Sequence, residues 1–272
     1  MLRMIYESQP RENIMNIKNI LKSSVSAFAL AAAVAVPAHA EVFQDFTVTY
    51  EGKTVTADKI TGGYTEIFTV TSPTTFATSA YATLNSFYQN EGTVFVPNFS
   101  GATYGLYATF VATGNIVDNG STFEGTSGTI NLYLDKYVGG PTTLSLPGTG
   151  GSQIGRGPNA GDDQLLASTS SFQFGSGHNF PGATQAANGD FSLTFTDFLL
   201  TPEGESYFIA PVPFYLQFTI DGNFGSFPLP SLNGSSTITG AANVTFVPEP
   251  GMTALFGIAL LGLGMARRRQ RK

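Results

Sequence analysis

The chain has 272 residues, with 13 basic and 19 acidic side chains and a formal net charge of −6. The absence of cysteine excludes disulfides, thiol nucleophiles and thiolate metal sites. Between Glu41 and Val247, four basic residues stand against 16 acidic ones, and the resulting charge of −12 argues against nucleic acid or anionic lipid as a partner.

The first 40 residues have the pattern of a secretory signal peptide. Lys18 and Lys22 form a short basic region, the run Val25–Val36 carries no charge, and Ala38-His39-Ala40 is a small-x-small cleavage site. An apolar run of this length is too short to span a membrane. We therefore predict export, with cleavage at the end of this segment. Met15 is the expected true start, because the polar stretch before it does not belong to such a signal.

Residues 41–247 are predicted to form a single all-β domain, long enough for one hydrophobic core. Bulky and β-branched residues alternate with polar ones at a period of two, and Gly, Pro, Asn and Asp bound the runs. Many strands with such turns are typical of a β-sandwich, and we expect a jelly-roll-like one. The Gly- and Pro-rich segment 139–161 is expected to be a long loop. The predicted strands are Phe46–Tyr50, Tyr64–Val70, Ser79–Gln89, Tyr104–Ala112, Thr129–Asp135, Phe191–Phe195, Phe214–Ile220 and Ser236–Val247.

Acidic residues offer two kinds of candidate site in this domain. A glycosidase needs two carboxylates about 5–9.5 Å apart, and the candidates are Asp162-Asp163 and the pair Glu203 and Glu205. Asp118, Asp162 and Asp163 are loop oxygen donors of the kind that calcium prefers. Because no calcium-loop motif accompanies them in the sequence, we predict neither a metal nor another cofactor.

His178 is the single histidine after residue 40, in a Gly- and Ser-rich stretch where a solvated loop is expected. A Ser–His–Asp triad would require this residue, but the sequence has no G-x-S-x-G motif. We therefore predict a protein that is not an enzyme. The aromatic residues Tyr88, Phe99 and Phe180 are candidates either for stacking on sugar rings or for packing in the core.

Residues 248–272 have three parts: Pro248-Glu249-Pro250, the uncharged run Met252–Ala266, and a basic cluster that ends the chain. A helix over the 15 residues of the run is roughly 22 Å long, shorter than the roughly 30 Å hydrocarbon core of a bilayer. Basic residues after such a span stay on the cytoplasmic side. We therefore predict a short transmembrane helix with the β domain on the outer side of the membrane. The basic cluster is Arg267, Arg268, Arg269, Arg271 and Lys272.

This tail resembles the PEP-CTERM sorting signal in the order and spacing of its three parts. In that family a membrane-embedded cysteine protease, the exosortase, recognises the Pro-Glu-Pro segment and removes the tail. The family occurs in Gram-negative bacteria that make exopolysaccharide. The resemblance implies an exosortase as partner, a transient anchor in the inner membrane, and a final location outside the cell. The sorting residues that it implies are Pro248, Glu249, Pro250, Arg267, Arg268 and Arg269.

A second resemblance covers parts of the β domain. Thr56–Glu66, Gly189–Phe195 and Phe214–Gly222 are similar to the flocculation-associated PEP-CTERM proteins, which are implicated in holding cells together in polysaccharide flocs. The resemblance implies no catalytic residues. It favours a non-enzymatic protein of the cell surface or extracellular matrix that associates with exopolysaccharide in flocs or biofilm. A secreted two-carboxylate glycosidase and a plain carbohydrate-binding module are the alternatives.

Overall fold

The computed structural model describes residues 43–98, 100–179, 189–212, 217–225 and 228–247. By its internal packing the chain divides into two units, Met1–Val42 and Phe43–Lys272, and all described residues belong to the second. The predicted cleavage residues Ala38 and Ala40, and the predicted sorting tail 248–272, lie outside the described residues. Within the described residues, no helix is long and apolar enough to cross a membrane.

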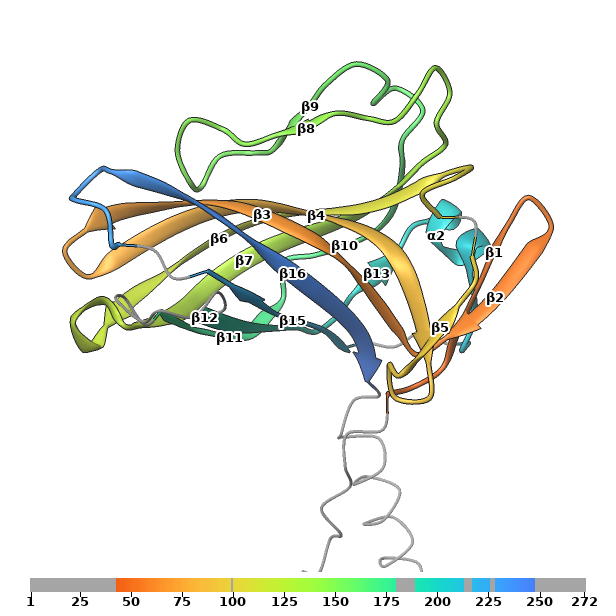
Figure 1. Cartoon of the computed structure of the whole chain (residues 1–272), viewed down its shortest axis with the longest axis horizontal. Coiled ribbons are helices and arrows are strands. Elements are labelled where there is room, and N and C mark those ends of the chain that lie inside the picture. The colour runs from red at the N-terminus through yellow and green to blue at the C-terminus, as the bar shows by residue number, and fades with distance from the viewer. Residues whose placement is uncertain (1–42, 99, 180–188, 213–216, 226–227, 248–272) are drawn as a thin grey trace, which may run out of the picture. The chain divides into compact units, whose positions relative to one another are not determined.

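The described part of the chain consists mainly of β-strands, as the alternating pattern predicted (Figure 1). Each predicted strand has a counterpart, and several are longer than expected: the segment predicted over Tyr64–Val70 is β3, Lys59–Ser72. Of the strand predicted over Phe214–Ile220, residues 214–216 lie outside the described residues. A short helix, α2 (Pro202–Tyr207), and a 3-10 turn, η1 (Asp118–Gly120), are also described. The other strands are β1 (Phe46–Tyr50), β2 (Lys53–Ala57), β4 (Thr75–Gln89), β5 (Val94–Val96), β6 (Gly105–Val117), β7 (Thr122–Asp135), β8 (Leu144–Ser145), β9 (Gly155–Arg156), β10 (Gln164–Thr169), β11 (Phe172–Asn179), β12 (Gly189–Phe195), β13 (Leu199–Leu200), β14 (Phe208–Ala210), β15 (Gln217–Phe224) and β16 (Ser235–Val247).

Eight of these strands form one closed barrel in chain order. β3, β4, β6, β7, β11, β12, β15 and β16 each pair antiparallel with the next, and β16 returns to pair with β3. The ring closes between β7 and β11, where the segment Ser176–His178 pairs with Thr122–Glu124. Where the strands of such a barrel pair, they satisfy one another's backbone groups. The β7–β11 ladder is limited to these three residue pairs.

The two-sheet sandwich that we expected is therefore replaced by a barrel. Period-two alternation indicates one buried face for each strand, and it is the same in a sandwich and in a barrel. The two folds differ in which distant strands pair, here Ser235 of β16 with Thr69 of β3. Such a pairing leaves no local signature in the sequence, so the pattern predicted the strands but not the closure.

The inward faces of the barrel strands form the hydrophobic core. Ile130, Leu132 and Leu134 of β7 share one face, as the alternation predicted, and all three are buried. On the neighbouring strand β6, Leu106 and Phe110 also share one face and are buried. The side chains between them point outward, which gives each strand its alternating burial.

A second, three-stranded sheet of order β14-β1-β2 joins the barrel through aromatic packing. The ring centroid of Phe46 in β1 lies 4.9 Å from that of Phe246 in β16 and 6.2 Å from that of Phe87 in β4. It also lies 6.3 Å from that of Phe208 in β14. All four rings are buried, so Phe46 connects the small sheet to two barrel strands.

The long segment between β7 and β10 covers part of the outer face of the barrel. Gly150 donates its N–H to Thr69 Oγ1 at 2.8 Å, and Ser79 Oγ donates to the carbonyl of Ser152 at 2.5 Å. These bonds hold the segment, which includes the short hairpin β8–β9, against β3 and β4 (Figure 1). Ser79 points outward from β4 and is nevertheless fully buried, because this segment lies over it.

Phe46→Ala is expected to lower the free energy of unfolding by about 3–5 kcal/mol, because it leaves a cavity among buried rings. Urea unfolding of the full-length protein measures the change. Phe174→Ala is the matched control: Phe174 is 54% exposed on β11, and its loss should change stability by no more than about 0.5 kcal/mol. Equal losses in the two variants would contradict the role given to this aromatic cluster.

Candidate functional site

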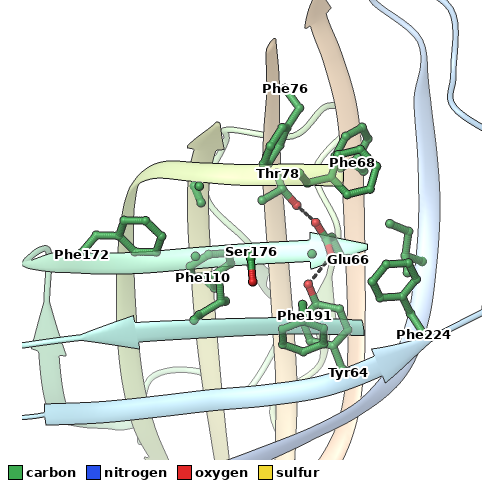
Figure 2. Close-up of a pocket in the computed structure, with 17 residues that line it drawn as sticks. Tyr64, Glu66, Phe68, Phe76, Thr78, Phe110, Phe172, Ser176, Phe191 and Phe224 are labelled. Carbon is green, nitrogen blue, oxygen red and sulfur yellow. Dashed lines mark hydrogen bonds between the residues drawn. The ribbon is translucent and has the colours of Figure 1, made fainter. Parts of the chain in front are cut away.

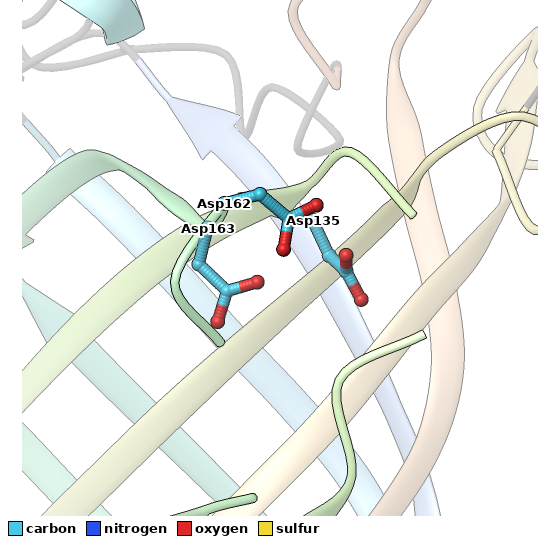
Figure 3. A group of neighbouring side chains, drawn as sticks. All are labelled: Asp135, Asp162 and Asp163. Carbon is cyan, nitrogen blue, oxygen red and sulfur yellow. The ribbon is translucent and has the colours of Figure 1, made fainter. Parts of the chain in front are cut away.

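The predicted carboxylate pair Asp162-Asp163 meets a third carboxylate, Asp135 at the end of β7 (Figure 3). One oxygen from each of the three side chains lies within 4.8 Å of the others. Asp118, the remaining calcium candidate, does not belong to this group. It lies in η1, just before β7 begins, and the length of β7 places it roughly 40 Å from Asp135 along the strand.

The oxygens of this cluster already accept hydrogen bonds from the loop around them. Asp135 accepts the N–H groups of Tyr137 at 2.9 Å and of Thr142 at 2.6 Å. Asp162 accepts the N–H of Val138 at 2.8 Å. The spacing of the three carboxylates suits a shared cation such as calcium. Their existing partners show that they also fix the backbone that follows β7.

Arg156 of β9 links the loop to the same cluster. Its guanidinium lies 3.5 Å from Asp163 Oδ2 and 4.5 Å from the ring centroid of Tyr133, and it donates to the hydroxyl of Tyr107 at 3.3 Å. Tyr107 in turn donates to Asp163, and burial is the main reason that its pKa is raised. The tyrosine therefore remains a donor at neutral pH. This network gives Asp163, whose side chain is fully buried, a cationic partner.

A groove with both polar and apolar lining lies beside the carboxylates. It has a volume of about 120 Å³ and is lined by residues of β4, β6, β7 and the segment after β7. Thr83 and Asn85 are exposed in it, and Asp135 and Tyr137 line it from β7 and just beyond. Hydroxyl, amide and carboxylate groups next to an aromatic ring suit a ligand rich in hydroxyl groups, since such a ligand both donates and accepts.

A second cavity lies inside the barrel and has Glu66 as its polar centre (Figure 2). Its volume is about 60 Å³, and all eight barrel strands contribute to its wall. Glu66 is 8% exposed, and the hydroxyls of Tyr64 and Thr78 each donate to one of its carboxyl oxygens. Most of the other lining side chains are aromatic or aliphatic, so this carboxyl group is held in apolar surroundings.

The environment of Glu66 disfavours its charged form. Burial raises the pKa of Glu66 above its ordinary value of 4.5, and the hydrogen bonds from Thr78 and Tyr64 offset only part of that effect. Glu66 has no ion-pair partner within the described part of the chain. A carboxylate without a cation in such a site is costly, so proton uptake or a cationic ligand would stabilise it.

Glu66 was not among the residues that sequence reasoning selected, although a signal was present. Tyr64, Glu66 and Phe68 alternate along one strand and therefore share a face, and that face is the buried one. An acidic residue on the apolar face of a strand is unusual. Asp135 carried no comparable signal, because the last residue of a strand is often polar and solvated.

The remaining sequence candidates lie apart from these cavities. His178 belongs to β11 rather than to a loop, and its Nδ1 lies 2.7 Å from Asp190 Oδ1 on β12, with both side chains well exposed. Glu203 and Glu205 lie in helix α2 instead of an extended segment. Residues two apart on a helix point about 200° apart, so these two carboxylates do not face each other.

Comparison with known proteins concerns the end of the chain. Residues 246–270 match the family model of the PEP-CTERM protein-sorting motif. No curated protein and no solved structure matches the chain. The match includes the predicted sorting residues and indicates an exported protein that is a substrate of an exosortase. It begins at Phe246, which is still part of the last barrel strand.

The raised pKa of Glu66 predicts how stability depends on pH. The folded state holds this proton more tightly than the unfolded state, so the stabilisation is present at low pH and is lost as pH rises above about 4.5. Glu66→Gln removes this dependence. We expect the free energy of unfolding of the variant, minus that of the wild type, to increase as pH rises from 4 to 8. Urea unfolding at several pH values measures this difference.

Glu124→Gln, an exposed position on β7, controls for the loss of one charge. A stability difference that stays constant or shrinks with pH would contradict this assignment.

Proposed function

We propose that this chain is a non-enzymatic protein of the cell surface or extracellular matrix that associates with exopolysaccharide in flocs or biofilm. The sorting motif at residues 246–270 carries the proposal, because it assigns the chain to the exosortase route. The exported domain fits such a role in its chemistry. Its charge of −12 favours solubility, and its abundant Thr, Ser and Asn provide hydrogen-bonding groups for a hydroxyl-rich polymer.

The groove beside Asp135 is our candidate for the sugar contact. Tyr137 offers a half-buried ring there, and Asn85 and Thr83 offer exposed amide and hydroxyl groups. Of the aromatic residues predicted to stack on sugars, Tyr88 lies in β4 and is half-buried. Phe99 and Phe180 lie outside the described residues.

The glycosidase alternative needs two carboxylates that face each other across a cleft lined by aromatic side chains. Among the described residues, the aromatic-lined cavity contains a single carboxyl group, Glu66. Asp162 and Asp163 are engaged with the loop. Release of reducing ends from the host's own polysaccharide by the purified protein would favour the enzyme instead. A carbohydrate-binding module without a matrix role would bind the same polymer, but deleting its gene would leave cell aggregation unchanged.

Sugar binding in the groove predicts a specific loss on substitution. Tyr137→Ala should weaken binding to the host exopolysaccharide at least about fivefold, because the stacking surface is lost, whereas Tyr137→Phe should retain most of it. Co-sedimentation of the full-length protein with the polymer measures both. Gln173→Ala, an exposed position on β11 away from the groove, is the control. Equal binding by wild type and Tyr137→Ala would remove the groove from the proposal.

The sorting motif predicts that processing depends on Glu249. From the sequence we expect Pro248 and Pro250 to favour an extended backbone around Glu249, the form that proteases generally bind, and Glu249 to supply a charge for recognition. Glu249→Ala should leave full-length protein in the inner membrane of the host. Cell fractionation and the intact mass of the surface-released protein measure this outcome. Glu203→Ala, an exposed glutamate in α2, should be processed normally. The same trimmed mass in both variants would contradict recognition of this residue.

A further inference from the structure

The cavity inside the barrel combines a buried acid with a wall of aromatic rings. Glu66 is the only acidic side chain among the described residues that line it, and it has no cationic partner there. Its two oxygens each accept one hydroxyl, from Tyr64 and Thr78. A carboxylate oxygen can accept more than one hydrogen bond, so capacity remains for a donor from a ligand.

Aromatic side chains surround this carboxyl group on several sides (Figure 2). Tyr64 stacks on Phe191 with centroids 4.8 Å apart, and Phe68 stacks on Phe76 at 4.9 Å. The faces of aromatic rings carry negative electrostatic potential and attract cations, most strongly where water is excluded. Carboxylate and rings therefore favour the same kind of ligand, one with a positive charge and an apolar surface.

The size and position of the cavity limit that ligand. Its volume of about 60 Å³ exceeds the roughly 10–15 Å³ that one water molecule needs, which leaves room for a compact ligand of about five non-hydrogen atoms. Ser176, Phe191 and Leu193 line the cavity and are only half-buried, so it reaches the surface on the side of β11 and β12. The net negative charge of the domain raises the local concentration of cations outside.

We propose that the barrel interior is a binding site for a small alkylammonium ion, whose charged nitrogen pairs with Glu66 and whose alkyl groups pack against the surrounding rings. The site is separate from the groove and from the sorting tail, so it does not depend on the function proposed above. Neither the sorting motif nor the exopolysaccharide hypothesis requires such a cavity. It adds a small-molecule binding activity to the exported domain.

The proposed site predicts binding that weakens at low pH. Tyr64 is the other titratable side chain among the described residues that line the cavity, and burial raises its pKa further above 10, so it stays neutral. Glu66 is therefore the group whose protonation would abolish the ion pair. Because burial raises its pKa above 4.5, the ammonium ion should be released as pH falls toward and through that raised value.

A matched pair of probes tests the proposal. tert-Butylammonium and tert-butanol have nearly the same shape and differ in charge. We expect NMR titration of the full-length protein at pH 8 to show at least about tenfold tighter binding of the ammonium ion. Contacts between its methyl groups and the rings of Phe76 and Phe191 should appear in nuclear Overhauser spectra. Phosphate buffer is required, because Tris is itself an ammonium ion.

Glu66→Gln should reduce the preference for the ammonium ion to within about threefold, whereas Glu124→Gln should retain it. If the Glu66→Gln variant does not fold, the pH titration of the wild type gives the same information: ammonium binding falls with pH while tert-butanol binding does not. Equal binding of both probes would overturn the proposal in favour of a neutral apolar ligand. Absence of binding, or contacts outside the cavity, would also overturn it.

Discussion

The interior of this domain depends on a short stretch of backbone pairing between β7 and β11. Ser176–His178 and Thr122–Glu124 close the ring, and without them the cavity around Glu66 would lack one wall. Beyond this stretch β7 changes partner and pairs with β10 through Ile130–Leu134. The consecutive strands β10 and β11 thus both pair with β7, each along a different part of it. The ring of Phe172 packs against Gly125 and Gly128 of β7, at the point where β7 changes its partner from β11 to β10. Side-chain contact there takes the place of backbone pairing between β7 and β11.

The aromatic interior exists because glycines lie opposite the rings. A Cβ at Gly125 would come within 2.6 Å of the Phe172 ring, and one at Gly175 within 2.4 Å. A Cβ at Gly189 would come within 2.1 Å of Phe224. Small residues therefore make room for large ones on the same strand or on the next, as the limited width of an eight-stranded barrel requires. At these positions glycine and phenylalanine are two aspects of a single packing solution.

The sequence predicted local features of this fold better than distant ones. Strands such as Phe46–Tyr50 were predictable because alternation is a property of neighbouring residues. The closure of the barrel was not, since it depends on residues far apart in the chain. The same distinction holds for the sites: Glu66 could have been found from its place on an apolar face. The meeting of Asp135 with Asp162 and Asp163 depends on how the long loop folds back. The sorting tail was the most predictable part, because its signal is contiguous in sequence.

The order of strands also determines when the domain can finish folding. Within the barrel, each strand from β3 to β15 pairs with the next barrel strand along the chain, so these hairpins can form as the chain emerges from the translocation channel. The pairing of β16 with β3 joins Ser235 to Thr69, 166 residues apart, and must come last. Until then the sheet has open edges that other chains can pair with. This vulnerable interval ends at Val247, at the point in translocation where the sorting motif begins to arrive.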